Sequence, residues 1–342
     1  MTLNFKQEVH NARILSVGAY RPPRVVHNNE IVGKIDSSDE WVQQRTGIIT
    51  RHYADADESL IDMAVKASHI AIKRAGLIVD DIDAVIFATI SYPYQAPSAA
   101  TELIARLERP HAAAFDISAA CAGFTYGVGI ANDMIRNGTA RNVLLVGAEK
   151  LSDFTDPYDR ATAFIFADGA GAVVIGPSAD QGIGPTIWGS TAETRDAIMF
   201  TPSYLDFKNS ARVTDAAWPN ISQQGQTVFR WAVFEMAPIG LKAIEAAGIT
   251  PEQLAAFIPH QANERIIDSL AKSMKLPDSV AIARDIRTTG NTSAASIPLA
   301  MDALLKERPE LHGKSALLIG FGAGLVYAGQ VVELPPAPNK SI

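Results

Sequence analysis

Apolar and polar positions along the chain follow two alternating patterns, one with the period of a helix and one of short runs that are apolar on both faces. In the first half these patterns predict, in order, a helix over 59–75, a strand over 84–90, a helix after Pro97, a strand over 113–117, a helix over 122–136 and a strand over 142–146. Strands without polar alternation are typical of sheets that are buried between helices. The pattern therefore predicts a layered α/β fold.

The same pattern of helix, glycine and strand occurs twice along the chain. The sequence AIKRAG, beginning at Ala71, resembles AIEAAG, beginning at Ala243, at an offset of 243 − 71 = 172. The strand sequence that begins at Arg141 resembles the one that begins at Lys314, at an offset of 314 − 141 = 173. Similar sequences of helix, glycine and strand also arise by chance in α/β proteins. A shared offset of half the chain length nevertheless indicates a duplicated unit.

The duplication divides the chain into an N-terminal half, residues 1–185, and a C-terminal half, residues 186–342. The polar stretch 191–223 contains Pro202 and Pro219 and has no clear period. We interpret it as an extended surface segment between the two repeated patterns. No tract rich in glycine, serine or proline separates independent domains.

Composition and charge exclude several classes of function. The 342 residues are 47% hydrophobic and 20% charged, which is typical of a folded globular chain. The net charge is −7 and no run of Lys or Arg exceeds two neighbours, so a broad nucleic-acid-binding face is not expected. The N-terminus lacks an apolar targeting region, and the longest nearly apolar run, 315–329, is too short to span a membrane. We expect a cytoplasmic protein that does not contact membranes.

The chain has a single cysteine, Cys121, so an intramolecular disulfide is impossible. This cysteine lies where a predicted strand passes through small residues into the start of a helix. The positive end of a helix dipole and the free backbone N–H groups there favour the thiolate. A small buried residue at a tight packing point is the alternative interpretation. The sequence therefore offers Cys121 as a candidate nucleophile.

Two further polar residues occupy comparable places. His260 directly follows a predicted buried strand, where sites gather in open α/β sheets, and a cap of the next helix is its alternative role. Asn291 precedes small residues that open another helix, and an ordinary N-cap is its alternative role. The repeat offset places the position equivalent to Cys121 at 121 + 172 = 293. Asn291 lies two residues before this position. This relation predicts two helix starts about a pseudo-twofold axis, with His260 nearby.

Three motifs surround these residues, namely DISAACAGF from Asp116 to Phe124, PHQAN from Pro259 to Asn263 and GNTSAAS from Gly290 to Ser296. They resemble the motifs of 3-oxoacyl-acyl-carrier-protein synthase III, a ketoacyl synthase family of the thiolase superfamily. The resemblance extends over nearly the whole chain. It implies a thiolase-like five-layer αβαβα fold built from two duplicated halves, normally as a homodimer.

The resemblance also implies a decarboxylative Claisen condensation that primes type II fatty acid synthesis. Cys121 would attack a starter acyl-CoA and carry its acyl group. Backbone N–H groups of Cys121 and Ala323 would form the oxyanion hole. His260 and Asn291 would donate hydrogen bonds to malonyl-acyl-carrier protein as it loses CO₂. Acyl-CoA is then a substrate, and no cofactor or metal is expected.

Roles outside the catalytic centre follow from the same resemblance. Trp41 would stack on the adenine of CoA, and Arg45 and Arg160 would bind its phosphates, with an ordinary surface ion pair as the alternative for both arginines. Asn263 would line the pantetheine tunnel.

Two partners of the family, the carrier protein and a second copy of the chain, have expected contacts as well. Arg230 and Arg265 match positions that dock the acidic carrier protein, and Lys272 and Lys275 are possible contributors. Ala96 would reach across the dimer interface to close the acyl pocket. Because acetyl-specific relatives have an aromatic residue there, alanine predicts a larger starter group, unless Tyr92 or Tyr94 fills the space.

Other members of the superfamily fit the sequence less well. Thiolases use a second cysteine, which this chain lacks, and elongating ketoacyl synthases have a second histidine in place of Asn291. The alternative enzyme is a ketoacyl-synthase-III-like starter-unit enzyme or acyltransferase of a polyketide or other secondary-metabolite pathway. A non-catalytic partner subunit is a hypothesis from another class, and the presence of Cys121, His260 and Asn291 disfavours it.

Overall fold

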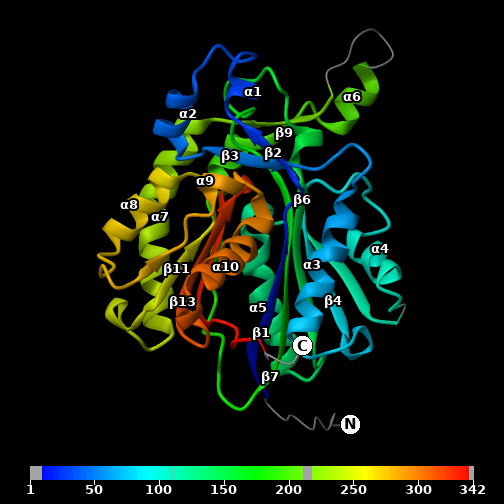
Figure 1. The fold of residues 1–342 in the computed structure, drawn as a ribbon, viewed down its shortest axis with the longest axis vertical. Coiled ribbons are helices and arrows are strands. Elements are labelled where there is room, and N and C mark those ends of the chain that lie inside the picture. The colour runs from blue at the N-terminus through cyan, green and yellow to red at the C-terminus, as the bar shows by residue number, and fades with distance from the viewer. Residues whose placement is uncertain (1–9, 110, 211–217, 339–342) are drawn as a thin grey trace.

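The computed structural model describes residues 10–109, 111–210 and 218–338, and its frame is a pair of five-stranded mixed sheets (Figure 1). The first sheet has the order β1 (Asn11–Tyr20), β7 (Asp168–Ser178), β6 (Val143–Lys150), β4 (Ala84–Ala88) and β5 (Ala113–Ile117). The second has the order β8 (Ile187–Ser190), β14 (Val326–Glu333), β13 (Ser315–Gly322), β11 (Ala256–Pro259) and β12 (Ala281–Ile282).

The two sheets have the same topology. In each, the first strand in this order pairs antiparallel with the second, the second antiparallel with the third, and the remaining pairs are parallel. This identity confirms the duplicated architecture that the repeat offset predicted. The predicted boundary between residues 185 and 186 falls in the connection between β7 and β8.

Helices form three layers around the sheets (Figure 1). Helices α5 (Gly123–Arg136) and α10 (Ser296–Glu307) lie between the sheets and pack on both. The outer face of the first sheet is covered by α3 (Leu60–Arg74) and α4 (Ala99–Arg106). The outer face of the second is covered by α7 (Gly225–Ala246) and α8 (Glu264–Ser273). The five-layer αβαβα prediction is therefore confirmed.

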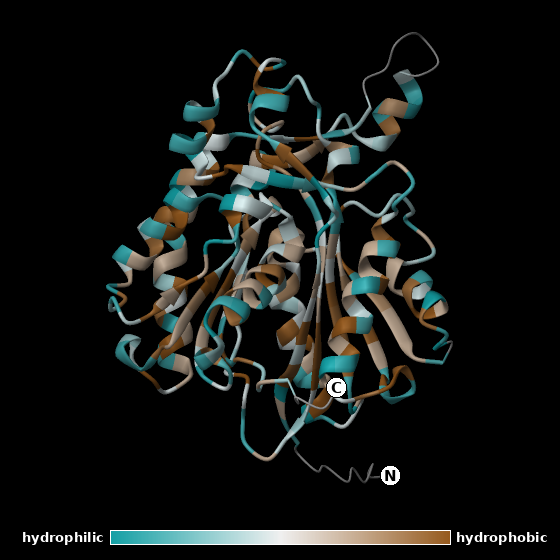
Figure 2. Cartoon of the chain, in the orientation of Figure 1, coloured by the Kyte–Doolittle hydropathy of each residue, from teal (hydrophilic) through white to brown (hydrophobic). Residues whose placement is uncertain are grey.

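The central helices and both sheets share one apolar core. Val128 of α5, Met301 of α10, Val173 of β7 and Ile258 of β11 belong to a single buried cluster. Burial of each such side chain contributes about 1.5–3 kcal/mol, so the two halves are stabilised by the same packed layer. Figure 2 shows hydrophobic residues along the strands and on the faces of the helices that pack against them.

The start and end of α3 follow from local chemistry that the sequence displays. Ser59 Oγ accepts a hydrogen bond from Asp62 N at 3.1 Å, and Asp62 Oδ2 accepts one from Ser59 N at 2.9 Å, which is a capping box. Gly76 follows with φ of 70°, a left-handed conformation that ends the helix at low cost. The helix predicted over 59–75 is thus confirmed with both of its boundaries.

A smaller layer, the cap layer, covers one end of the sheets, at the top of Figure 1. Its elements are β2 (Arg24–His27), α1 (Asn29–Val32), α2 (Asp39–Thr46), β3 (Thr50–Tyr53), β9 (Ile198–Thr201), α6 (Tyr204–Ser210), β10 (Asn220–Gln223) and α9 (Ile286–Thr289). Within the described ranges, no helix has the length and apolar character needed to cross a membrane.

The described part of 191–223 lies largely at the surface, as expected, but it contains two strands and a helix that were not predicted. Strands β9 and β10 form an antiparallel pair, and Ile221 is buried with Ile198 packed beside it. Strands of four residues are too short to give a clear hydrophobic period, and Pro202 and Pro219 flank them. Residues 211–217 of this segment lie outside the described residues.

Candidate active site

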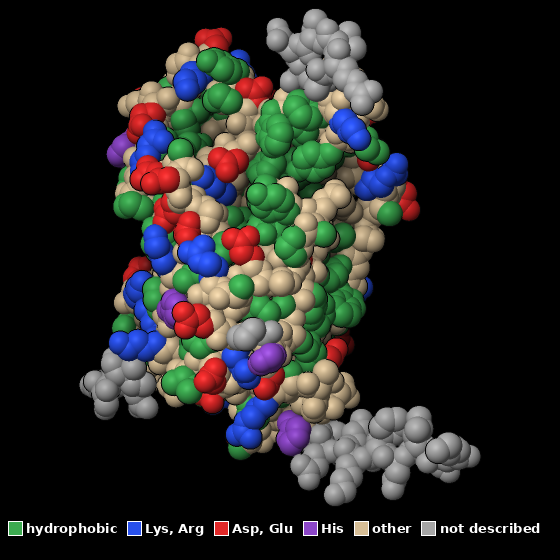
Figure 3. Space-filling model, turned by 90° about the vertical axis from the view of Figure 1, so that its right-hand side faces the viewer, with side chains coloured by type: hydrophobic (Ala, Val, Ile, Leu, Met, Phe, Trp, Pro, Cys, Tyr) green, Lys and Arg blue, Asp and Glu red, His purple; other side chains and the backbone are tan. Residues whose placement is uncertain are grey.

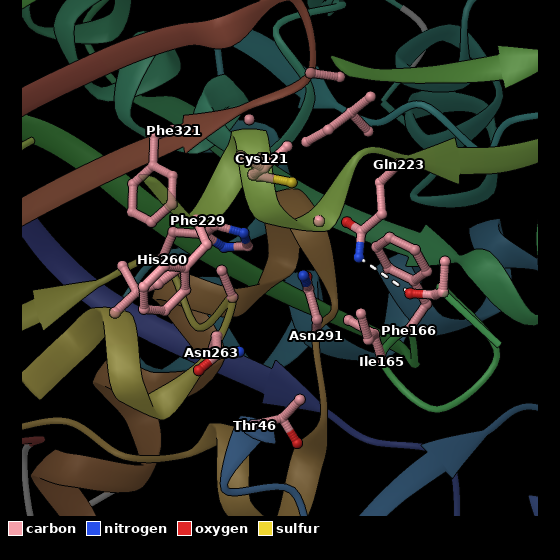
Figure 4. A pocket seen from close by; sticks show the side chains of 18 of the residues that line it. Thr46, Cys121, Ile165, Phe166, Gln223, Phe229, His260, Asn263, Asn291 and Phe321 are labelled. Atoms are coloured by element: carbon pink, nitrogen blue, oxygen red, sulfur yellow. Dashed lines mark hydrogen bonds between the residues drawn. The ribbon is translucent and has the colours of Figure 1, made fainter. Parts of the chain in front are cut away.

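A cavity of about 630 Å³ extends from the cap layer to the space between the two halves. Its wall contains every predicted catalytic, CoA-binding and carrier-docking residue except the possible contributors Lys272 and Lys275: Trp41, Arg45, Cys121, Arg160, Arg230, His260, Asn263, Arg265, Asn291 and Ala323. Figure 4 shows Cys121, His260 and Asn291 facing one space from three separate segments of the chain. The structure therefore brings the three motifs together.

Cys121 lies in a short turn of 3₁₀ helix, η2 (Ala120–Ala122), between β5 and α5. Ala120 has φ of 45°, a left-handed backbone that turns the chain sharply from strand to helix. Ser293, in η6 (Ser293–Ala295), has φ of 48° at the equivalent place in the second half, since 293 − 120 = 173. The turns η2 and η6 are in contact, so the two repeats meet at the cysteine.

Burial acts against ionisation of the Cys121 thiol. It raises the pKa of the thiol to about 12, and the nearby Glu149 carboxyl acts in the same direction. The Ser293 hydroxyl favours the thiolate, although it forms no hydrogen bond of regular geometry. Loss of hydration therefore opposes the thiolate that the helix start was expected to favour.

His260 follows β11 and is fixed from several sides. Its backbone N–H donates to Ile319 O at 2.7 Å, and its Nδ1 lies 2.7 Å from Ser296 Oγ. The Phe321 ring packs edge-on against the imidazole, with 5.2 Å between ring centroids. Burial lowers the pKa of His260 to about 3, so the ring is neutral at physiological pH.

Asn291 is held by its backbone and by one end of its side chain. Its N–H donates to Ile165 O at 3.0 Å, and its carbonyl accepts from Ala167 N at 2.9 Å. Its Oδ1 accepts from Ser293 N at 2.8 Å, which leaves Nδ2 directed into the cavity, as Figure 4 shows. Thr292 is the N-cap of η6 and no side chain caps that turn, so the N-cap role offered as the alternative for Asn291 is not found. The Asn291 side chain instead presents two amide hydrogens to the cavity.

Gly322, the last residue of β13, brings the strand end against Cys121. A Cβ atom at Gly322 would lie 2.7 Å from Cys121 N and 3.1 Å from its Sγ, so only glycine permits this approach. The next residue, Ala323, lines the cavity at the same point. The predicted pair of oxyanion donors, Cys121 N–H and Ala323 N–H, thus comes from two backbone segments in direct contact.

The outer part of the cavity is aromatic and cationic. The guanidinium carbons of Arg45 and Arg160 lie 5.6 Å and 5.5 Å from the centroid of the Trp41 ring. Phe164 packs edge-on against Trp41 at 5.2 Å. Neither arginine forms an ion pair with a carboxylate of the described residues, so the surface ion pair offered as their alternative role is not found.

Asn263 and two more arginines complete the cavity mouth. Asn263 caps α8, because its Oδ1 accepts from Arg265 N at 2.9 Å, and its Nδ2 donates to Arg45 O at 2.9 Å. Arg230 and Arg265 are exposed, and Arg265 lies over the Phe229 ring at 5.2 Å. The possible contributors Lys272 and Lys275 are exposed on and after α8 but do not line the cavity.

Ala96 lies away from the cavity of its own chain. It is exposed in the loop between β4 and α4 and does not line the wall. Tyr92, whose hydroxyl donates to Glu102 at 2.6 Å, and Tyr94 pack together in this loop with 5.6 Å between their rings. Neither tyrosine lines the cavity, so neither fills its acyl end in the single chain.

Sequence reasoning missed two buried polar residues beside the site, Glu149 and Ser296. Glu149, in β6, accepts hydrogen bonds from the hydroxyl groups of Thr89 and Ser91, and burial raises its pKa to about 7. Its carboxyl also accepts from the backbone of Ile90, which lines the cavity. A carboxylate inside an otherwise apolar strand sequence was the available signal for Glu149. Ser296 contacts His260 and sits inside a motif already quoted.

Solved structures share this architecture over nearly the whole chain. The priming β-ketosynthase from the R1128 polyketide biosynthetic pathway is 41% identical, with a TM-score of 0.95 and coverage of 98% of this chain and 99% of that one. The 3-oxoacyl-[acyl-carrier-protein] synthase III from Aquifex aeolicus is 35% identical, with a TM-score of 0.86 and coverage of 94% and 100%. Fold and site together define a thiolase-like condensing enzyme.

The sequence comparisons give the family within that class. Residues 115–192 match 3-oxoacyl-[acyl-carrier-protein (ACP)] synthase III, and residues 244–334 match its C-terminal part. A β-ketoacyl-[acyl-carrier-protein] synthase III from Streptomyces glaucescens is 55% identical over 324 residues, which cover 95% of this chain and 96% of that protein. The chain belongs to the 3-oxoacyl-[acyl-carrier-protein] synthase III family, and it is an acyltransferase.

Proposed function

We propose that the enzyme condenses a starter acyl-CoA with malonyl-acyl-carrier protein, releases CO₂ and CoA, and forms the 3-oxoacyl-carrier protein that primes fatty acid synthesis. The observation that carries this proposal is the convergence of Cys121, His260 and Asn291 on one cavity whose mouth holds Trp41 and four arginines. The names of the relatives at about half identity support the same reaction. Acyl-CoA enters as a substrate, and the proposal invokes no resident cofactor or metal.

In the first half reaction, Cys121 takes the acyl group. Its sulfur forms a bond to the thioester carbonyl carbon, the carbonyl oxygen becomes an oxyanion, and the bond to the CoA sulfur then breaks. The Cys121 proton leaves with CoA as its thiol, so the step is balanced. Backbone N–H groups of Cys121 and Ala323 would stabilise the oxyanion, and a single donor of this kind contributes on the order of 10²- to 10³-fold in rate.

In the second half reaction, malonyl-acyl-carrier protein replaces CoA. Loss of CO₂ leaves its electron pair on the thioester as an enolate, and His260 and Asn291 donate hydrogen bonds to the enolate oxygen. The enolate carbon then attacks the acyl carbon on Cys121, the bond from that carbon to the Cys121 sulfur breaks, and the sulfur takes up one proton from solvent. A neutral histidine suits this role, because the low pKa of His260 leaves it a neutral hydrogen-bond donor.

The arginines at the mouth provide for two acidic partners. Arg45 and Arg160 both contact the indole ring of Trp41, which suits stacking on adenine and pairing with the phosphates of CoA. Arg230 and Arg265 would dock the carrier protein, since a chain with net charge −7 needs a local cationic patch to bind an acidic partner.

A homodimer and a cytoplasmic location complete the proposal. Strand β5 is an edge of the first sheet, and Phe115 on it is 37% exposed. Figure 3 shows a broad area of hydrophobic side chains on the side of the molecule where α4 lies in Figure 1. An apolar area of this kind suits contact with a second copy. In such a dimer the loop that carries Ala96 would reach the acyl pocket of the partner subunit.

A second candidate function has one observation in its favour. The priming β-ketosynthase of a polyketide pathway matches this chain with a TM-score of 0.95, which supports a starter-unit enzyme of a secondary-metabolite pathway. Both candidates use the same two half reactions and differ in the acyl group that Cys121 accepts. The choice of starter therefore separates them.

The test is a panel of acyl-CoA substrates assayed with malonyl-carrier protein. The purified enzyme is incubated with malonyl-carrier protein and one starter at a time: acetyl-, isobutyryl-, butyryl- or hexanoyl-CoA. The mass of the carrier protein is then measured by mass spectrometry. We expect the mass of a 3-oxoacyl-carrier protein with at least one starter. Absence of this product with every starter, while malonyl-carrier protein remains intact, would refute the proposed reaction.

A further inference from the structure

The hydroxyl group of Ser296 lies between the imidazole of His260 and the backbone of the next residue. Ser296 Oγ is 2.7 Å from His260 Nδ1 and accepts a hydrogen bond from Gln261 N at 3.3 Å. Ser296 is 1% exposed, so bulk water does not reach it. Among the residues that the structure describes, these two groups are the only partners of this hydroxyl.

The single proton of Ser296 decides which nitrogen of His260 carries hydrogen. If Nδ1 carried it, Ser296 Oγ would accept from both Nδ1 and Gln261 N, and its own proton would have no acceptor among the described residues. If Nδ1 is unprotonated, Ser296 donates to it while accepting from Gln261, and every group is paired. A buried donor without a partner is disfavoured, so the second arrangement is the stable one.

We propose that Ser296 is a positioning residue that selects the tautomer of His260 in which Nε2 carries hydrogen. With Nδ1 held as an acceptor, the Nε2–H group faces the cavity beside the Asn291 amide. The inference rests on the proposed function and deepens it, because it explains how a neutral histidine becomes a donor to the enolate oxygen. In the other tautomer, the lone pair of Nε2 would face the enolate and repel it.

The surroundings of Ser296 point to this role and not to a purely local one. Ser296 is the first residue of α10, but it is not a capping residue, since Ala295 occupies the N-cap and no side chain caps the helix. Phe321 fixes the plane of the imidazole from one side. The hydroxyl thus adds no support to the helix end, and its short contact with Nδ1 is its main interaction.

The experiment compares the full-length wild type with Ser296→Ala and, as a matched control, Ser68→Ala. Ser68 is also fully buried, in α3, and its hydroxyl has no partner in the described part of the chain. Long-range proton–nitrogen NMR spectra of histidine-labelled, substrate-free protein report the tautomer, and the signals of His260 are those lost in His260→Ala. Decarboxylation of malonyl-carrier protein and acylation of Cys121 are measured on the same samples.

We expect the Nε2–H tautomer in the wild type and in Ser68→Ala. In Ser296→Ala the ratio of the Nε2–H to the Nδ1–H tautomer should fall on the order of tenfold. Decarboxylation should fall in proportion to the fraction of the Nε2–H tautomer that is lost, while acylation of Cys121 is retained. An Nδ1–H tautomer in the wild type, or a change in only one of tautomer and decarboxylation, would overturn the inference. The spectra need no substrate, so a wrong tautomer leaves the proposed function standing, whereas a wild type without condensation activity refutes that function and leaves the spectra valid.

Discussion

Substitution of Gly322 by alanine is the sharpest structural test of the nucleophile's surroundings. Gly322 has extended backbone angles, φ −175° and ψ −156°, which alanine also adopts, so the effect comes from space alone. The new Cβ would lie 2.7 Å from Cys121 N and 2.9 Å from Cys121 Cβ. Ordinary contact begins at 3.4 Å, so the end of β13 and the turn η2 must separate by about 3.4 − 2.7 = 0.7 Å.

A separation of this size acts on the two oxyanion donors. It moves Ala323 N–H away from Cys121 N–H, and a misplacement of about 1 Å in a catalytic group costs on the order of 10²-fold in rate. We therefore expect the acylation of Cys121 to slow by roughly 10- to 100-fold. Overpacking a well-filled region typically costs about 1–3 kcal/mol, so the free energy of unfolding should fall by that amount without loss of the fold.

The assay for Gly322→Ala is the rate at which an acyl-CoA adds one acyl mass to the protein, together with thermal unfolding. The matched control is Gly33→Ala, since a Cβ at Gly33 would have no neighbour within 4 Å. The control should acylate at the wild-type rate. If Gly322→Ala also acylates and unfolds like the wild type, the close approach of β13 to Cys121 is wrong, and the oxyanion hole built on it fails.

The other predictions concern the second half reaction, the partners and the pH response. Asn291→Ala should still accept the starter group but lose decarboxylation by on the order of 10²-fold, and equal loss of both steps would contradict its role. Arg265→Glu should raise KM for malonyl-carrier protein most at low salt and leave acyl-CoA loading intact, and unchanged carrier kinetics at low salt would locate docking elsewhere. Ala96→Phe should shift kcat/KM toward acetyl-CoA by about tenfold, and a wild type that prefers acetyl with an unaltered mutant would refute this. Glu149 has its pKa raised to about 7 from 4.5, so its contribution to stability is lost as pH rises from 4.5 to 7. Urea denaturation of Glu149→Gln should therefore show up to about 2 kcal/mol less loss between pH 5 and 7 than the wild type, and equal loss would show that the carboxyl is not perturbed.

The architecture was predictable because its signals are local and repeated. The helix over 59–75 has a capping box at Ser59 and a stop at Gly76, and its image in the second half has the same glycine ending. The short strands β9 and β10 were missed, since each pairs with a strand on the far side of α6 and their burial depends on the cap layer. A strand of four residues is too short to show a clear alternation of apolar and polar positions.

The residues of the site were predictable from the sequence, but the effect of burial on their pKa values was not. Cys121, His260 and Asn291 stand in recognisable motifs, and the structure brings them to one cavity. The effect of burial on the pKa of Cys121 was not predicted, because burial is a tertiary property that no neighbouring residue displays. The role of Ser296 was missed because its partner, His260, lies 36 residues earlier in the chain, so only the fold shows their contact.

The proposed condensation is tested most directly by following the single cysteine, Cys121, during turnover. The enzyme is incubated with a starter acyl-CoA, digested and mapped by mass spectrometry, before and after addition of malonyl-carrier protein. We expect one acyl group on the peptide that contains Cys121, no label in Cys121→Ser, and loss of the group as 3-oxoacyl-carrier protein forms. An acyl group on any other residue, or product formed by Cys121→Ser at the wild-type rate, would contradict this expectation.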